Sequence, residues 1–342
     1  MTRQLETPRA LAVPTQARRP GLSSFVWLVW RQHSSLVVWS SLAAAAMCGV
    51  LLLLQSTLAG THCWGPLYDH VMPGPANQCV VTAVDHTMLY SWSLRLLQGV
   101  VFAPVLIGVL WGAPLVAREH ERGTHDLAWG QGIPARRWLA GKVGVLALLV
   151  VTLGVPVWLC ARLVATSMVR LAPWQVDGAF GWVPFATLSP LVIPYSLATL
   201  ALGVLASVLL RRMIVAMVVV AIVCAGLGVG TAELLRPHYL PPTTAYAPIS
   251  LHAAGPPDAH NAHYLAEFGF ADAAGHEVIP DPRSFSCASN DAVCLRLLGI
   301  TQTTAVYQPS DHEAAFQWIE AGLCLLLAAA CTSMAVWRVR PR

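Results

Sequence analysis

Six apolar blocks, each about 20 residues long, dominate this sequence. Roughly 20 residues at 1.5 Å per residue cross about 30 Å of hydrocarbon, so each block is long enough to span a bilayer. No charged residue lies near the middle of a block, and a segment inside lipid must satisfy its own backbone hydrogen bonds. The blocks therefore predict six transmembrane α-helices, over residues 36–58, 95–116, 143–162, 187–209, 213–232 and 317–336.

Four charged residues lie at or close to the ends of these blocks. We expect Arg95, Arg162, Glu233 and Glu320 to reach the membrane interface from there. No charged pair lies at mid-membrane, where a carrier driven by protons or sodium needs titratable or coordinating residues. The sequence therefore argues against an ion-coupled carrier.

The composition supports lipid as the solvent for this chain. Of its 342 residues, 56% are hydrophobic and 11% are charged, whereas a soluble domain carries roughly 25% charged residues. The ten-residue alternating segments of a membrane β-barrel do not recur. The predicted fold class is an all-α membrane protein.

The distribution of charge predicts the orientation of the spans. The segments 1–35, 117–142, 210–212 and 337–342 hold 15 of the 21 Lys and Arg residues but 4 of the 17 Asp and Glu residues. Segments rich in Lys and Arg stay in the cytoplasm. We therefore predict a multi-pass protein of the plasma membrane with both termini in the cytoplasm. The basic residues fit topology and contact with anionic lipid, and no compact basic domain suggests a nucleic-acid partner.

The chain divides into four predicted regions. Residues 1–34 form a cytoplasmic tail and an interfacial helix that begins near Phe25, although its aromatic residues could equally be an interfacial belt for the first span. Residues 35–232 hold helices 1 to 5 and the cytoplasmic loop 117–142. Residues 233–316 are too long for a plain loop and predict a small extracellular cap between helices 5 and 6. Residues 317–342 hold helix 6 and a cytoplasmic tail.

Two pairs of cysteines fall in predicted outer segments, where oxidising conditions favour disulfides. Cys63 and Cys79 share the first outer loop, and Cys287 and Cys294 share the last one. We predict the disulfides Cys63–Cys79 and Cys287–Cys294, with free thiols as the alternative.

Signatures of catalysis and of metal binding are missing. The chain has no G-x-x-x-x-G-K-[ST] motif for ATP and no G-x-S-x-G motif. His120 and His125 are five residues apart, so they diverge around a helix and do not predict a metal site. His252, His260 and His263 with Asp258 could hold a metal, but a solvated loop is the favoured interpretation. We therefore predict that the chain is not an enzyme and binds no metal or cofactor.

The loop 117–142 mixes charged residues with apolar ones such as Trp129, Ile133 and Trp138. This pattern suits short amphipathic helices at the membrane surface that dock a cytoplasmic partner. A solvated loop that only sets topology is an equal alternative from the residues alone.

Several short motifs resemble a known family. They are GAPLVAREHERGT at residues 112–124, WGQ at 129–131, RWLAGK at 137–142, WRQH at 30–33 and LRPHYLPP at 235–242. Together with the six spans, they resemble the membrane subunits of ABC exporters of the type-2 permease superfamily, with actinobacterial examples the most similar.

The resemblance implies a partner and a mechanism. It implies a separate ABC ATP-binding subunit, which binds ATP and magnesium, and a second copy of the permease in a homodimer surrounded by lipid. The loop between spans two and three then acts as the coupling element, in or beside which lie Glu119, Glu121, Arg122, Gly123, Thr124 and His125. Glu121 could pair with a cation on the ATPase or on the interfacial helix, and Gly123 would permit a sharp turn.

The resemblance also implies a function. The chain would form the pathway of an ATP-driven exporter that works by alternating access, with spans two and five along the path and Pro104 and Pro114 kinking span two. An apolar pathway suggests a hydrophobic or amphipathic substrate such as a drug, an antibiotic or a lipid. The alternatives are a membrane sensor or assembly scaffold without transport activity, and an intramembrane enzyme.

Overall fold

The computed structural model describes residues 22–59, 76–122, 134–171, 180–248, 263–264, 269–278 and 292–339. Within them, six helical segments are long and apolar enough to cross a membrane, which confirms the six predicted spans. These segments are Ser34–Leu58, Met88–Glu121, Ala135–Met168, Val192–Leu210, Met213–His238 and Glu313–Arg338.

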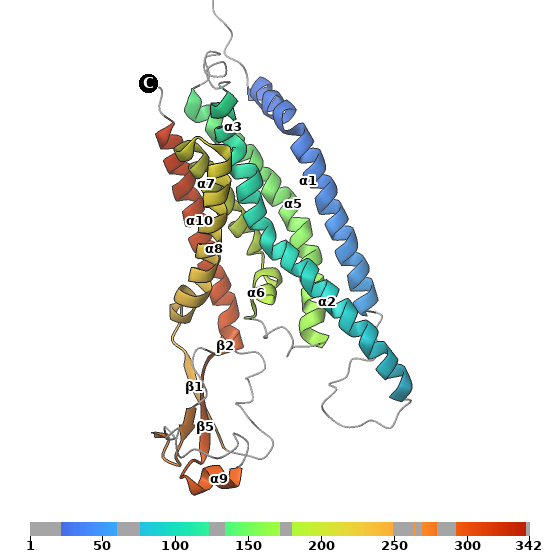
Figure 1. The fold of residues 1–342 in the computed structure, drawn as a ribbon, viewed down its shortest axis with the longest axis vertical. Coiled ribbons are helices and arrows are strands. Elements are labelled where there is room, and N and C mark those ends of the chain that lie inside the picture. The colour runs from blue at the N-terminus through green and yellow to red at the C-terminus, as the bar shows by residue number, and fades with distance from the viewer. Residues whose placement is uncertain are drawn as a thin grey trace, which may run out of the picture.

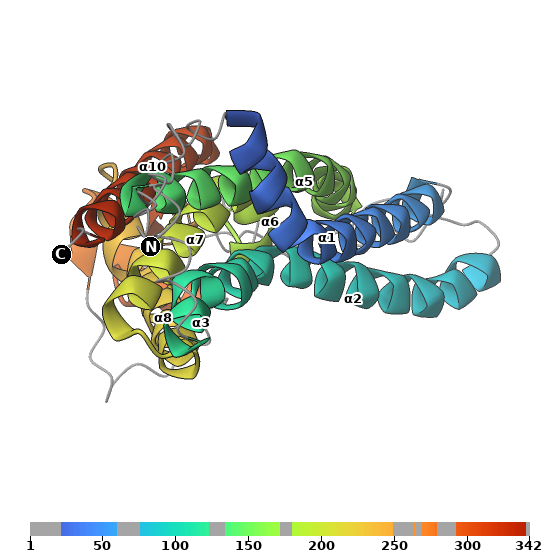
Figure 2. The same cartoon turned by 90° about the horizontal axis from the view of Figure 1, so that it is seen from above.

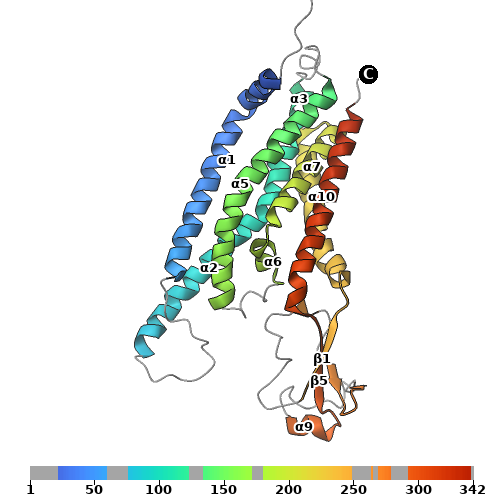
Figure 3. The same cartoon turned by 180° about the vertical axis from the view of Figure 1, so that it is seen from behind.

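The long helices form one bundle (Figure 1). They are α1 (Leu22–Ala59), α2 (Ala76–Ile107), α5 (Ala135–Leu171), α7 (Val192–Leu210), α8 (Met213–Gly230) and α10 (Glu313–Arg338). Half of the most apolar part of α7 is buried inside the protein, compared with 6% for α1. Thus α7 lies at the centre of the bundle, whereas α1 lies at its edge against α5 (Figure 3).

The helix predicted to begin near Phe25 and the first span form one continuous helix. Helix α1 begins at Leu22 and runs through the whole span. Figure 2 shows its first turns at an angle to the rest of the helix. The N-terminal helix is therefore the beginning of α1, turned away from the span axis.

The second span extends beyond its predicted end. Helix α2 passes into a π-helix, η1 (Gly108–Gly112), and then into the short helix α3 (Pro114–Arg122). The sequence placed residues 117–122 in a loop because their charges end the apolar block. They remain helical, and two of the charged side chains, Glu119 and Glu121, find partners inside the protein, which are described below.

Glycines let η1 approach α7 closely. A Cβ atom added to Gly112 would lie 2.6 Å from the carbonyl oxygen of Leu200 and 2.9 Å from the Cα atom of Gly203. A Cβ atom on Gly108 would lie 2.7 Å from the carbonyl oxygen of Thr199. Small residues are what allow such backbone contact between membrane helices. The second span is thus fixed against the central helix just before α3 begins.

A short buried helix, α6 (Trp182–Leu188), precedes the fourth span. It packs against α2 and α5, and Phe185 on it is fully buried. The apolar block at 187–209 had predicted a single helix from residue 187. Instead, Ser189 and Pro190 separate α6 from α7, because proline disfavours the helical conformation of the residue before it.

Beyond the ends of α8 and α10 lies a small antiparallel sheet (Figure 1). Its strands are β1 (Thr243–Pro248), β2 (His263–Tyr264), β3 (Gly269–Ala271), β4 (Glu277–Val278) and β5 (Gln302–Gln308). The strand order is β1-β5-β3-β4, and β2 also pairs with β5. Thr243 pairs with Tyr307 and Gly269 with Thr304 in the register. The short helix α9 (Ala292–Leu297) contributes Leu295 to a small core with Ile300. The sequence predicted an ordered unit in residues 233–316 but not its strands.

The predicted disulfides lie largely outside the described residues. Cys294 on α9 is disulfide-bonded. Its predicted partner Cys287, and Cys63 and the side chain of Cys79, are not among the residues that the structure describes. His252, His260 and Asp258 of the weighed outer metal site also lie outside them, while His263 pairs with Gln308 in the sheet.

The described parts of all four Arg-rich segments lie at one end of the bundle. The start of α1, the end of α3, the turn between α7 and α8, and the end of α10 lie at the end opposite the sheet (Figures 1 and 3). This arrangement agrees with an even number of spans. That the Arg-rich end faces the cytoplasm stays a prediction from the charge distribution.

Candidate functional site

Helix α3 carries three of the predicted coupling residues, Glu119, Glu121 and Arg122, at the Arg-rich end of the bundle. Arg122 is the last residue of this helix. Gly123, Thr124 and His125 lie outside the described residues. The part of the predicted coupling element that the structure describes is therefore a helix that continues the second span.

The first turn of α3 is capped by a side chain from another span. The backbone N–H groups of Val116 and Ala117 donate hydrogen bonds of 2.9 and 2.7 Å to Oγ of Ser207 on α7. The first N–H groups of a helix have no partner within it, and Pro114 carries no N–H at all. Ser207 is fully buried, so this contact satisfies two donors that water cannot reach. Sequence reasoning missed Ser207 because a serine in an apolar helix carries no distinctive signal.

Glu121 caps the fifth span. Its Oε1 accepts a 2.8 Å hydrogen bond from the backbone N–H of Met213, the first residue of α8. Arg212 at the N-cap position makes no side-chain cap of its own. A carboxylate there satisfies an unpaired donor and faces the positive end of the helix dipole. The described partner of Glu121 is thus a backbone group of span five, which the sequence did not predict.

The turn between α7 and α8 brings Met213 within reach of α3. It consists of Arg211 and Arg212, and Arg211 has a left-handed backbone conformation with φ of 55°. The N–H of Arg211 bonds the carbonyl oxygen of Ser207. Ser207 therefore closes the end of α7 with its carbonyl oxygen and holds α3 with its hydroxyl.

Glu119 points into the bundle and pairs with Lys142 on α5. Nζ of Lys142 lies 2.5 Å from Oε1 of Glu119 and 4.0 Å from the centre of the Trp138 ring. Lys142 is 2% exposed, and Oε2 of Glu119 is buried without a hydrogen-bond partner among the described residues. A buried lysine charge needs an opposing charge, because removal from water is costly. Lys142 thus joins the second span to the third.

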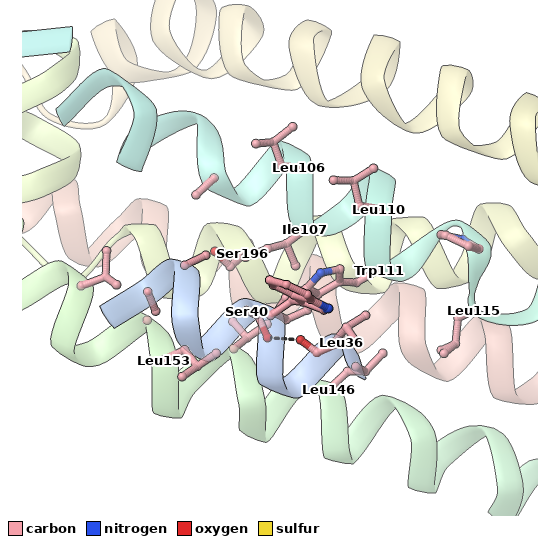
Figure 4. A pocket seen from close by; sticks show the side chains of 18 of the residues that line it. Leu36, Ser40, Leu106, Ile107, Leu110, Trp111, Leu115, Leu146, Leu153 and Ser196 are labelled. Carbon is pink, nitrogen blue, oxygen red and sulfur yellow. Dashed lines mark hydrogen bonds between the residues drawn. The ribbon is translucent and has the colours of Figure 1, made fainter. Parts of the chain in front are cut away.

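A cavity of about 1120 Å³ opens beside this ion pair. Its walls come from α1, α2, η1, α3, α5 and the start of α7. Figure 4 shows Leu106 and Leu110 along one wall, Leu146 and Leu153 along another, and Trp111 and Ser40 between them. Span two therefore lines this cavity, whereas α8 contributes no described residue to it.

A second ion pair is buried near the sheet end of the bundle. Glu320 on α10 is 2% exposed, so the prediction that it reaches the membrane interface is wrong. Arg236, in the 3-10 helix η4 (Arg236–His238), donates to both oxygens of Glu320 at 2.5 and 3.3 Å, and the hydroxyl of Tyr195 also donates to it. Glu320 stays buried because an arginine from the end of the fifth span comes to it.

Aromatic rings surround this pair. The guanidinium carbon of Arg236 lies 4.0 Å from the centre of the Phe185 ring, and Phe316 and Tyr239 pack edge to face beside it. Burial raises the pKa of Tyr239 to about 12, so its hydroxyl stays neutral at physiological pH. The cluster ties α6, α7, η4 and α10 together at the end opposite α3.

Comparisons with known proteins place the chain in a family. Residues 41–236, more than half of the chain, match the family model described as ABC-2 membrane transporter related. The match includes α3, Lys142, Ser207 and the turn that carries Met213. No curated protein and no solved structure matches the sequence. The chain is a multi-pass membrane protein that belongs to the ABC-2 membrane transporter related family, and is thereby related to the membrane subunits of ABC transporters.

Proposed function

We propose that the chain is the permease subunit of an ATP-driven ABC exporter. The observation that carries the proposal is the way α3 is built into the bundle. It is bonded to α7 through Ser207, to α8 through Glu121 and to α5 through Lys142. A force applied to the segment that follows α3 therefore acts on spans three, four and five together.

The energy comes from a separate subunit in this proposal. The chain has no motif that cradles the phosphates of ATP, and its family relates it to membrane subunits of ABC transporters. An ABC ATP-binding subunit binds ATP and magnesium and seats the coupling element, residues 119–125, in its surface. Two permeases and two such subunits make the transporter. Closure of the ATP-binding subunits moves α3, and the bundle alternates between inward and outward access.

The cargo is hydrophobic or amphipathic. The cavity beside α3 is lined largely by Leu, Val, Ala and Trp side chains, which favour an apolar ligand over a hydrated one. A drug, an antibiotic or a lipid fits this description. The cavity adjoins Glu119 and Lys142, so a movement of α3 changes its charged end directly.

ATP-driven transport in reconstituted vesicles tests the proposal. The full chain and its ABC ATP-binding subunit are reconstituted together, and the accumulation of labelled amphipathic compounds is followed with and without ATP. We expect ATP-dependent accumulation that disappears when the phosphate-binding lysine of the ATPase is replaced. Vesicles in which the ATPase turns over at the same rate with and without the permease, and in which nothing accumulates, would contradict the proposal and favour a sensor or scaffold.

A further inference from the structure

The cavity between α1, α2 and α5 is elongated along these helices. Its lining extends along α1 from Ser35 to Met47 and along α5 from Lys142 to Val157. At 1.5 Å per residue these stretches measure roughly 18 and 22 Å. A groove about 20 Å long suits an extended alkyl chain better than a compact, rounded molecule.

One side of the cavity is open between α1 and α2. Trp39, Leu106 and Leu110 line it and are themselves exposed. In a bilayer this opening lies at the depth of the lipid tails, because both helices belong to membrane spans. A ligand with a long apolar tail can therefore enter sideways from the membrane without passing through water.

The charged groups that line the cavity gather at its Arg-rich end. Among the described lining residues they are Arg118, Glu119 and Lys142. The charges of Lys142 and Glu119 compensate each other at 2.5 Å, and the Lys142 ammonium also faces the Trp138 ring. Arg118 is exposed, and no described carboxylate lies within ion-pair distance of it. Among the described lining residues, this end of the cavity thus carries one positive charge more than it has negative charges.

We propose that this cavity binds a single-chain amphiphile with an anionic head group, with the head at Arg118 and the tail between α1, α2 and α5. The inference rests on the proposed function and names the substrate class of its site. A guanidinium donates two parallel hydrogen bonds to a carboxylate or phosphate. An alcohol offers one uncharged oxygen in their place, and a quaternary ammonium has no oxygen to accept them and is repelled by the positive charge. The apolar walls bury the tail.

Binding of matched amphiphiles to the purified full chain tests the inference. The chain is placed in nanodiscs of zwitterionic lipid without ATP or ATPase, and displacement of a radiolabelled fatty acid is measured. The competitors share one long alkyl tail and carry a carboxylate, an alcohol or a quaternary ammonium. We expect the carboxylate to compete about tenfold better than the alcohol, as a hydrogen bond to a charged group implies, and the ammonium to be the weakest.

Two substitutions and a matched control locate the head and the tail. Arg118→Gln should reduce carboxylate binding to the level of the alcohol and leave alcohol binding unchanged. Arg137→Gln removes an exposed arginine on α5 that does not line the cavity, and should change nothing. Ala43→Phe places a ring into the groove from an exposed position on α1 and should weaken all the competitors equally.

The outcomes separate this inference from the proposed function. The proposed site for an anionic head group would be contradicted if the ammonium competitor bound most tightly. It would also be contradicted if Arg118→Gln still preferred the carboxylate over the alcohol. If anionic phospholipid added to the nanodiscs displaces the fatty acid, the same site is confirmed with a membrane lipid as its occupant. If the complex binds the fatty acid but shows no ATP-driven transport, the anionic site is supported and the proposed exporter function is contradicted. If the complex transports cargo but does not bind the fatty acid, the exporter function is supported and the anionic site is contradicted.

Discussion

Glu320→Ala should destabilise the folded protein by about 3–5 kcal/mol, because it leaves the Arg236 charge buried without its partner. Both oxygens of Glu320 accept hydrogen bonds, and the pair connects the end of the fifth span to the sixth. Tyr195 and Arg236 would each lose an acceptor that water cannot replace. The measurement is thermal unfolding in detergent, followed by the loss of the monodisperse peak in size-exclusion chromatography.

Matched variants distinguish the effect of breaking the Glu320–Arg236 ion pair from the effect of removing any carboxylate. Glu233→Ala removes an exposed glutamate near the same end of the bundle and should leave the unfolding temperature unchanged. The double substitution Glu320→Leu with Arg236→Met should recover much of the stability, because two apolar side chains leave no unpaired charge. Equal unfolding temperatures for Glu320→Ala and Glu233→Ala would show that the buried pair does not stabilise the bundle.

Glu121→Ala should reduce the stimulation of the partner ATPase by the permease roughly five- to tenfold, which corresponds to the ~1 kcal/mol contributed by a helix cap. The alanine removes the acceptor for the N–H of Met213, so α3 loses its bond to the fifth span. Movement of the coupling element would then reach α7 through Ser207 but no longer reach α8 directly. The measurement is the ATPase rate of the reconstituted complex relative to that of the ATPase alone.

Glu121→Gln distinguishes a helix cap from an ion pair. Glutamine keeps an amide oxygen that accepts from Met213, so we expect most of the stimulation to remain. If Glu121 instead acts by pairing with a cation on the ATPase, glutamine should fail as fully as alanine. Equal amounts of both variants in the membrane are the control, and a normal ATPase response in Glu121→Ala would remove the coupling role altogether.

Hydropathy predicted the spans because each depends on its own residues. Six blocks of adequate length and without central charges define six helices, whatever their neighbours. The wrong predictions concern positions whose environment is set by a residue far away in the sequence. Glu320 was expected at the interface, but its partner Arg236 is 84 residues away in the sequence. The end of the second span was set too early because α3 is held by contacts about 90 residues away in the sequence. Backbone N–H groups of its first turn bond Ser207, and the carboxylate of Glu121 bonds the N–H of Met213.

The short strands of the sheet could not be predicted for a related reason. β2 and β4 have two residues each, and pairing with β5 and β3 decides their conformation. The predicted coupling residues were chosen from a motif, which is local. Their contacts were not predicted, because Ser207 resembles any other serine in an apolar span. Sequence reasoning thus found where the candidate site lies but not how it is joined to the bundle.

Photocross-linking in native membranes tests most directly whether the loop after α3 seats an ATPase. A photoreactive residue is placed at Thr124, next to the end of α3, and, as a control, at Leu297 on α9, which is 84% exposed at the opposite end. We predict that Thr124 captures an ABC ATP-binding subunit, identified by mass spectrometry, and that Leu297 does not. Capture of a histidine kinase at Thr124, or of the ATP-binding subunit at Leu297 instead, would contradict the account.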